Sequence, residues 1–189
     1  MALRELDADW LKFVMESEAL TGIIPFDKNR SSTKRHIEIS LIVANASRYF
    51  DTRYINGMIT GKPSEYNSLL RSGTEGALRT VIPDAIRMHA LLEELVHDAS
   101  AGFDIDPSLE RTEAEHTVAQ RAEALHKRLI CLHPFKTGNG RTARLVCNQL
   151  RVLHGLKVHI FHNADAEGYY SGILRYREEV FLPSLAKAA

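Results

Sequence analysis

The stretch HPFKTGNGRTAR, residues 133–144, decides how this chain folds and which chemistry it suits. Two glycines flank Asn139, so the backbone can adopt left-handed conformations and turn its amide groups toward one point. Apolar residues on both sides of the stretch recur every three or four positions, which predicts a helix before it and a helix after it. We therefore expect a loop that leads into the N-terminal end of a helix at about Gly140.

The loop and the helix that follows have the features of an anion-binding site. The unpaired N–H groups and the positive dipole end of a helix N-terminus favour bound phosphate. Arg141 and Arg144 are three positions apart and share one face of the first turn, where two guanidinium groups can each bind oxygens in pairs. His133 ends the preceding helix, and a neutral imidazole beside a polyphosphate is suited to act as a general base. A Gly-Asn-Gly turn alone is more often only a turn, so the prediction rests on the joint pattern.

Most of the remaining chain is also predicted to be helical. The apolar spacing predicts helices at Asp9–Ala19, Ile37–Tyr49, 83–95, 112–132, 140–154 and 169–180. Thr112 with Glu115 resembles a capping box, Gly155 favours a helix end, and Pro183 is expected to stop the last helix. We expect an all-α fold that forms one domain. In it the N-terminal helices of residues 1–81 pack on a core of residues 82–189, with a short flap near 76–82.

The composition excludes several classes of function. The 189 residues include 24 Lys and Arg against 24 Asp and Glu, so no basic excess indicates nucleic-acid or membrane-surface binding. No segment approaches the roughly 18 apolar residues that a membrane-spanning helix needs, and acidic residues interrupt the N-terminus where a signal peptide would be apolar. Two cysteines make no disulfide framework. We expect a cytoplasmic protein that binds neither nucleic acid nor membrane.

Residues 133–144 resemble the signature of Fic (Fido) domains, HxFx(D/E)GNGRxxR, and match every specified position except one. The segment HTVAQRAEALHKRLICL is similar to the helix before the motif, and RLVCNQLRVLHGL is similar to the helix after it. AEGYYSGILRYREEV is similar to the helix with a Tyr-Tyr pair, so the resemblance covers roughly residues 82–180. It implies a compact single-domain helical bundle with a central helix-loop-helix that carries the active-site motif.

The resemblance implies a transferase that moves AMP from ATP to a hydroxyl of Ser, Thr or Tyr on a target protein. Its catalytic residues would be His133, Asn139, Arg141 and Arg144. His133 would deprotonate the target hydroxyl, Arg141 would stabilise the β-phosphate and leaving pyrophosphate, and Arg144 would reach the γ-phosphate. The nucleotide contacts implied are Lys136, Thr137, Gly138, Asn139, Gly140, Arg141, Arg144, Tyr169 and Tyr170. The two tyrosines would lie near the adenine.

The one departure from the signature is Thr137, which stands where the family has an acidic ligand for Mg²⁺. A hydroxyl lacks the charge that Mg²⁺ prefers in its ligands, and Lys136 adds a positive charge beside it. Three alternatives follow. Thr137 binds the metal weakly, or the enzyme uses another phosphate-containing donor, or the chain is a nucleotide-binding or protein-binding module that catalyses little. We favour retained transferase activity, because His133, Asn139 and both arginines are present.

A second departure concerns inhibition. Many relatives carry an inhibitory helix with the pattern (S/T)xxxE(G/N), but no glutamate of this chain has Ser or Thr four residues before it. Inhibition is therefore absent, degenerate, or supplied by a separate antitoxin-like protein, which would make this chain a toxin.

Overall fold

The computed structural model describes residues 6–22, 26–61, 90–97 and 105–187, and within these ranges the chain is mainly helical. Residues 90–97 are helical. The other elements, in chain order, are α1 (Ala8–Ala19), α2 (Ser31–Ala44), α3 (Thr52–Thr60), α5 (Arg111–Leu132), α6 (Asn139–Leu153), a 3-10 turn (Asn163–Asp165), α7 (Ala166–Tyr176), a π-helical segment (Arg177–Phe181) and α8 (Leu182–Lys187). The predicted all-α fold is confirmed.

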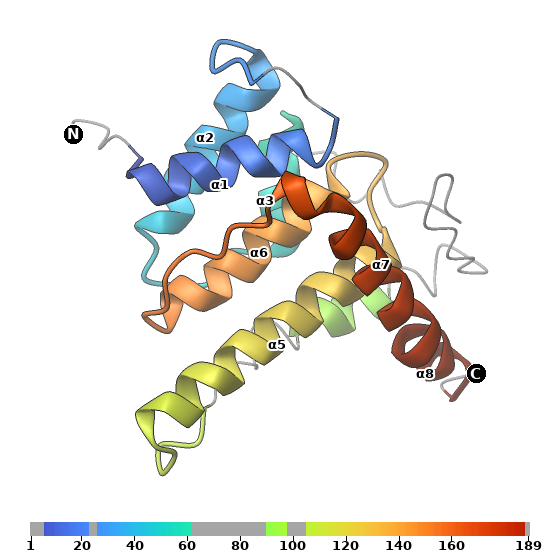
Figure 1. The fold of residues 1–189 in the computed structure, drawn as a ribbon. Coiled ribbons are helices and arrows are strands. Elements are labelled where there is room, and N and C mark those ends of the chain that lie inside the picture. Colours follow the sequence, from blue (N-terminus) through green and yellow to red (C-terminus); the bar gives the residue numbers. More distant parts are fainter. Residues whose placement is uncertain (1–5, 23–25, 62–89, 98–104, 188–189) are drawn as a thin grey trace.

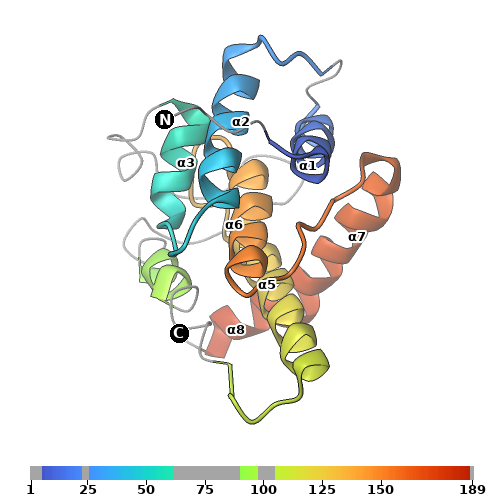
Figure 2. The same cartoon turned by 90° about the vertical axis from the view of Figure 1, so that its left-hand side faces the viewer.

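Helix α6 lies at the centre of the bundle and contacts α1, α2, α3 and α5 (Figures 1 and 2). It is buried along most of its length, including two polar side chains that hold loops through paired hydrogen bonds. Gln149 accepts from the N–H of Phe50 at 2.9 Å and donates to its carbonyl at 3.0 Å. Asn148 bonds the N–H and the carbonyl of His159 in the same way, at 2.7 and 3.0 Å. Buried amides are stable here because both of their polar atoms are satisfied.

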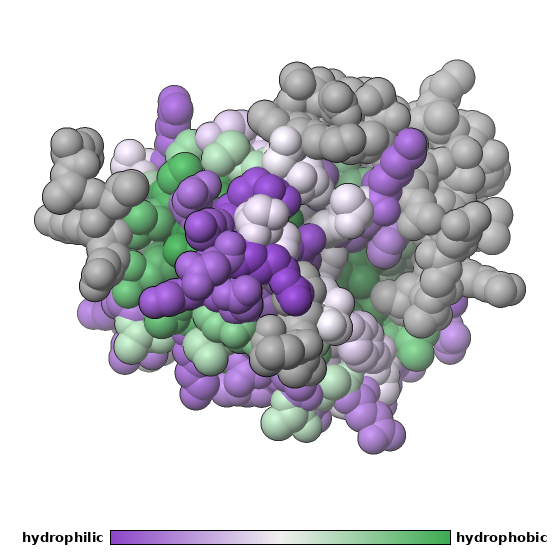
Figure 3. Space-filling model, turned by 90° about the horizontal axis from the view of Figure 1, so that it is seen from above, coloured by the Kyte–Doolittle hydropathy of each residue, from purple (hydrophilic) through white to green (hydrophobic). Residues whose placement is uncertain are grey.

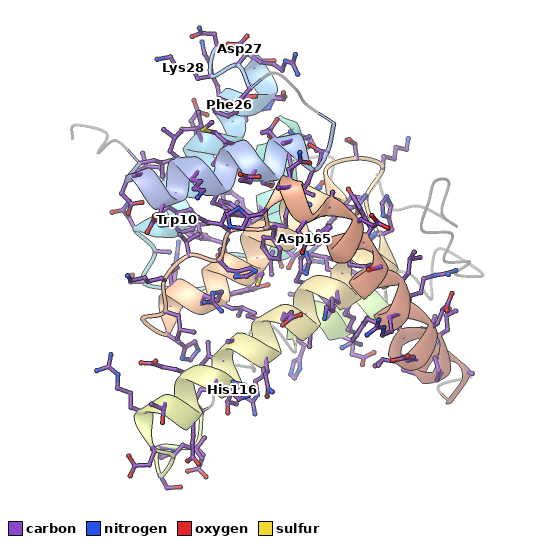
Figure 4. All side chains as sticks on the ribbon, viewed as in Figure 1. Trp10, Phe26, Asp27, Lys28, His116 and Asp165 are labelled. Atoms are coloured by element: carbon purple, nitrogen blue, oxygen red, sulfur yellow. The ribbon has the colours of Figure 1, made fainter. Side chains whose placement is uncertain are left out.

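Helix α1 crosses over α6 and packs through one stripe of side chains. Asp7 caps its N-terminus by accepting the N–H of Trp10 at 2.9 Å, which satisfies one of the free donors of the first turn. The buried stripe consists of Trp10, Phe13, Val14, Ser17 and Glu18, a spacing of three and four that fits one helix face. Figure 4 shows Trp10 beneath α1, on the side of α6. Seen from above, hydrophilic residues gather over the middle of the upper face and hydrophobic ones lie beside them (Figure 3).

The structure corrects several predicted boundaries. Helix α2 begins at Ser31 rather than Ile37 and ends at Ala44, because its first turns bury polar side chains that apolar spacing does not reveal. Helix α3 was not predicted. The capping box is wrong, since α5 begins at Arg111, ahead of Thr112, and Glu115 pairs with Arg111 at 2.8 Å. Pro183 does not stop the last helix. It lies just after the π-helical segment, and the helical run continues past it to Lys187.

Some predictions are not decided by this structure. The flap near 76–82 and the helix start at 83 lie outside the described residues. The division of the domain at residue 81 also stays a prediction. None of the helices in the described part of the chain is long and apolar enough to cross a membrane.

Candidate active site

A pocket of about 320 Å³ lies where α5 ends and α6 begins. Its lining residues are Thr21, His133, Lys136, Thr137, Gly138, Asn139, Gly140 and Arg141. All but Thr21 belong to the stretch 133–144, and Thr21 follows the C-terminal end of α1, which lies beside this loop in Figure 1. The structure therefore gathers most of the predicted site residues in one place. A second pocket of similar volume, lined partly by Arg111 and His154, contains none of them.

The backbone of the loop takes left-handed conformations at its two ends. His133 ends α5 with φ 49°, an uncommon value for a residue with a side chain, and Gly138 precedes α6 with φ 80°. A Cβ atom at Gly138 would also lie 3.0 Å from Nδ2 of Asn56, so glycine is required there by conformation and by space. These turns bring His133 and the N-terminal end of α6 to the same pocket.

Two asparagines hold the loop in this shape. Asn139 accepts the N–H of Phe135 at 2.9 Å and donates to its carbonyl at 2.7 Å, so its buried side chain stabilises the loop itself. Asn56, from α3, donates to the carbonyl of Thr137 and to the hydroxyl of Thr142, both at 3.0 Å. Sequence reasoning missed Asn56, because it lies on an unpredicted helix and belongs to no motif. The side chain of Asn139, predicted to be catalytic, has its main contacts within the protein.

The two motif arginines occupy different environments. Arg141 lines the pocket, its side chain is 11% exposed, and its NH1 lies 3.3 Å from Oε1 of Glu18. Arg144 is only 1% exposed and does not line the pocket. Its Nε and NH2 donate to the hydroxyl and carbonyl of Ser17 at 2.9 and 2.8 Å, and its NH1 donates to Tyr169 at 3.1 Å. The contact of Arg144 with a γ-phosphate stays a prediction.

The two tyrosines of α7 also lie away from the pocket lining. The hydroxyl of Tyr169 bonds Nε2 of His126 at 3.0 Å as well as Arg144, and burial raises the pKa of Tyr169. Tyr170 donates to the carbonyl of Leu20 at 2.6 Å. Both hydroxyls therefore tie α7 to neighbouring elements, and their contact with adenine stays a prediction.

Glu18 is the charged residue beside the site that the sequence analysis did not single out. It is fully buried, and its Oε1 accepts Nδ1–H of His36 at 2.7 Å. Burial acts to raise the pKa of Glu18, but the His36 hydrogen bond and the Arg141 charge bring it below its ordinary value. Burial also lowers the pKa of His36, so this pair is a carboxylate and a neutral imidazole. A signal was present, since Glu18 falls on the buried face of α1.

The donor set of the pocket does not fit a Mg²⁺ ion held by the protein. Magnesium prefers carboxylate and phosphate oxygens in octahedral geometry. Among the described residues, the pocket lining contains no carboxylate, and Lys136 and Arg141 make it positive. Nor do the described ranges contain a group of three or more His, Cys, Asp or Glu side chains that could hold a metal ion. The predicted weak metal contact of Thr137 has only a hydroxyl to offer, and we assign no step to a metal.

Comparison with known proteins agrees with this architecture. A family model described as the Fic/DOC family matches residues 48–150. The chain is similar to the crystal structure of a Fic domain containing signaling protein from Bacteroides thetaiotaomicron, with 20% identity and a TM-score of 0.65, covering 87% of this chain and 70% of that one. It is also similar to Fic-1 from C. elegans, with 18% identity and a TM-score of 0.62, covering 89% of this chain and 55% of that one. At such identities these structures show the fold alone. No curated protein matches the chain significantly.

Proposed function

Because the chain belongs to the Fic/DOC family, whose members generally transfer nucleotide-derived phosphate groups to proteins, we propose that it moves AMP from ATP to a hydroxyl of a target protein. The observation that carries the proposal is the pocket at the start of α6, where His133 and Arg141 lie with the Gly138–Gly140 turn. A base, an anion-binding turn and a cation are the groups that such a transfer needs.

The proposed reaction uses these groups as follows. His133 accepts the proton of a Ser, Thr or Tyr hydroxyl, and the hydroxyl oxygen forms a bond to the α-phosphorus of ATP. The bond from that phosphorus to the oxygen bridging to the β-phosphate breaks, and pyrophosphate leaves. Arg141 and the N–H groups at the start of α6 stabilise the charge that develops on the leaving group. Positioning and electrostatics account for most of the catalysis in this scheme.

A second candidate is a nucleotide-binding module of the same fold that catalyses little. The observation that favours it is the buried position of Arg144, which leaves Arg141 as the one motif arginine on the pocket lining. Thr137→Asp separates the two candidates, because it supplies the charge that Mg²⁺ prefers. Mg²⁺-dependent transfer that is more than tenfold faster in this variant would identify the natural chain as an impaired enzyme.

The main experiment incubates the purified chain with lysate proteins and ATP, labelled in parallel at the α-phosphate or the γ-phosphate. We expect label only from the α-position, because AMP carries that phosphorus. His133→Ala should abolish the label. His116→Ala is the matched control, since this exposed histidine also belongs to α5 but lies near its far end (Figure 4).

Label transferred only from the γ-position would show that the chain transfers the γ-phosphate of ATP rather than AMP. Label that persists in His133→Ala would remove this histidine from the reaction. If neither position gives label dependent on His133, the binding module or another phosphate-containing donor is the better assignment.

A further inference from the structure

The buried carboxylate of Glu18, on helix α1, contacts Arg141, the arginine that lines the pocket. Glu18 has no exposed surface, and its Oε1 lies 3.3 Å from NH1 of Arg141. The two residues are 123 positions apart, so α1 must be packed in place for this contact to exist. A fully buried charge is costly unless it is paired, and Arg141 is the cation that compensates Glu18.

The carboxylate is itself held by helix α2. Nδ1 of His36 donates to Oε1 at 2.7 Å, and the hydroxyl of Thr33 donates to Oε2 at 3.4 Å. Both partners are buried, and the ring of Phe13 packs edge-on against His36 with centroids 5.9 Å apart. Because two side chains of α2 hold Glu18, its position is defined before any ligand binds. A side chain of this kind orients a neighbour more effectively than a solvent-exposed glutamate does.

Glu18 contacts one nitrogen of the Arg141 guanidinium and leaves NH2 without a partner among the described residues. Glu18 does not line the pocket, whereas Arg141 does. Arginine has five N–H donors. Among the described residues only NH1 has a hydrogen-bond partner, and Nε is buried without one. Glu18 therefore holds Arg141 without competing for the pocket.

We propose that Glu18 is a positioning residue of the anion site, which fixes the guanidinium of Arg141 at the edge of the pocket from helix α1. The inference rests on the proposed function for the role of Arg141 as a phosphate ligand. It makes α1 part of the active site rather than a helix that only covers the core.

The test reads the position of Arg141 directly, by the ¹⁵N–¹H NMR signal of its Nε–H group in the full chain. Arg141→Lys identifies the signal by its loss. We expect a distinct signal in the wild type, because the guanidinium is held, and a shift toward the position of an exposed arginine in Glu18→Gln. Glu38→Gln is the matched control, because Glu38 is exposed on α2 and should leave the signal unchanged.

Glu18→Asp is a second variant that keeps the charge and the burial. It shortens the side chain by one methylene, about 1.5 Å, and should also release Arg141. An Arg141 signal that stays in place in folded Glu18→Gln and Glu18→Asp overturns the proposal.

Inorganic pyrophosphate, added to the wild type, separates this inference from the proposed function. A pyrophosphate-dependent shift of the Arg141 signal supports its role as a phosphate ligand. If the signal does not move with pyrophosphate but shifts toward the position of an exposed arginine in Glu18→Gln, Glu18 positions Arg141 and the proposed phosphate contact is wrong.

Discussion

Arg141 and Arg144 lie one turn apart on the same helix, yet the structure uses them differently. Arg141 lies at the edge of the pocket and has one partner in the described part of the chain, Glu18. Arg144 is buried, and three hydrogen bonds to Ser17 and Tyr169 occupy its guanidinium. The difference comes from α1, which presents two adjacent side chains to the two arginines. Ser17 places a hydroxyl and a carbonyl on Arg144, and Glu18 places a carboxylate on Arg141.

The comparison shows that a motif arginine can be a ligand-binding group or a structural group according to what packs against it. Arginine's planar fork suits both uses, because it can bind phosphate oxygens or satisfy several buried acceptors at once. The same substitution at the two positions should therefore have different consequences, which can be measured as changes in stability and in phosphate binding.

Arg144→Lys should give the largest effect, a loss of about 3 kcal/mol in the free energy of unfolding. An ammonium group cannot reproduce the three separate bonds to Ser17 and Tyr169, and buried acceptors lose their charged donor. Urea unfolding followed by circular dichroism measures the change. A variant as stable as the wild type would show that these contacts contribute little, and the contrast with Arg141 would fail.

Tyr169→Phe should cost about 2 kcal/mol of stability, since it removes the hydroxyl shared by Arg144 and His126 and leaves both buried groups short of a partner. Tyr170→Phe is the matched control. Within the described ranges its hydroxyl bonds only the carbonyl of Leu20, and the residue is 40% exposed, so the expected loss is below about 1 kcal/mol. Equal stability losses in the two variants, with weaker ATP binding in Tyr169→Phe, would instead indicate a contact between Tyr169 and adenine.

Arg141→Lys should change stability by less than about 1 kcal/mol, because a cation remains beside Glu18. It should weaken pyrophosphate binding about tenfold, or about 1.4 kcal/mol, through loss of the two-pronged contact. Calorimetric titration of pyrophosphate gives the affinity. Unchanged binding here, together with weakened binding in folded Arg144→Lys, would reverse the roles that the structure assigns to the two arginines.

The sequence predicted the loop, its two flanking helices and most of the pocket, because glycine turns and apolar spacing are local signals. It did not predict which arginine would line the pocket, since that depends on α1, which is more than 120 residues distant in the chain. Asn56 and His36 were missed for a related reason. Buried polar residues are recognised by their partners, and sequence spacing alone does not identify partners in other helices. Glu18 was also missed, although a charge on the apolar stripe of α1 is visible in the sequence.

Two residues that contact the arginines, Glu18 and Tyr169, share one further feature. Each of them is hydrogen-bonded to a buried histidine. His36 bonds Glu18, which pairs with Arg141, and His126 bonds Tyr169, which accepts from Arg144. Burial lowers the pKa of both imidazoles. At His36, Glu18 acts to raise the pKa, whereas the charges of Arg141 and Arg144 lower it further. At His126 no carboxylate opposes burial, and Arg144, His159 and Lys127 lower its pKa further.

The free energy of unfolding should therefore fall in mild acid. His126, which supports Arg144 through Tyr169, should contribute more to this fall than His36. A histidine with a depressed pKa stays neutral in the native state while the unfolded state takes up a proton below pH 6.5, so acid favours unfolding. One pH unit below that value, a histidine that stays wholly neutral in the native state costs about 1.4 kcal/mol; His126 should approach this cost, and His36 should cost less because Glu18 opposes its shift. Urea unfolding between pH 7.5 and about 5.5 should show this fall of the free energy of unfolding with decreasing pH. His126→Gln should flatten it more than His36→Gln, because Glu18 partly stabilises protonated His36. A steeper contribution from His36 would mean that Glu18 does not compensate the imidazole and is held mainly by Arg141.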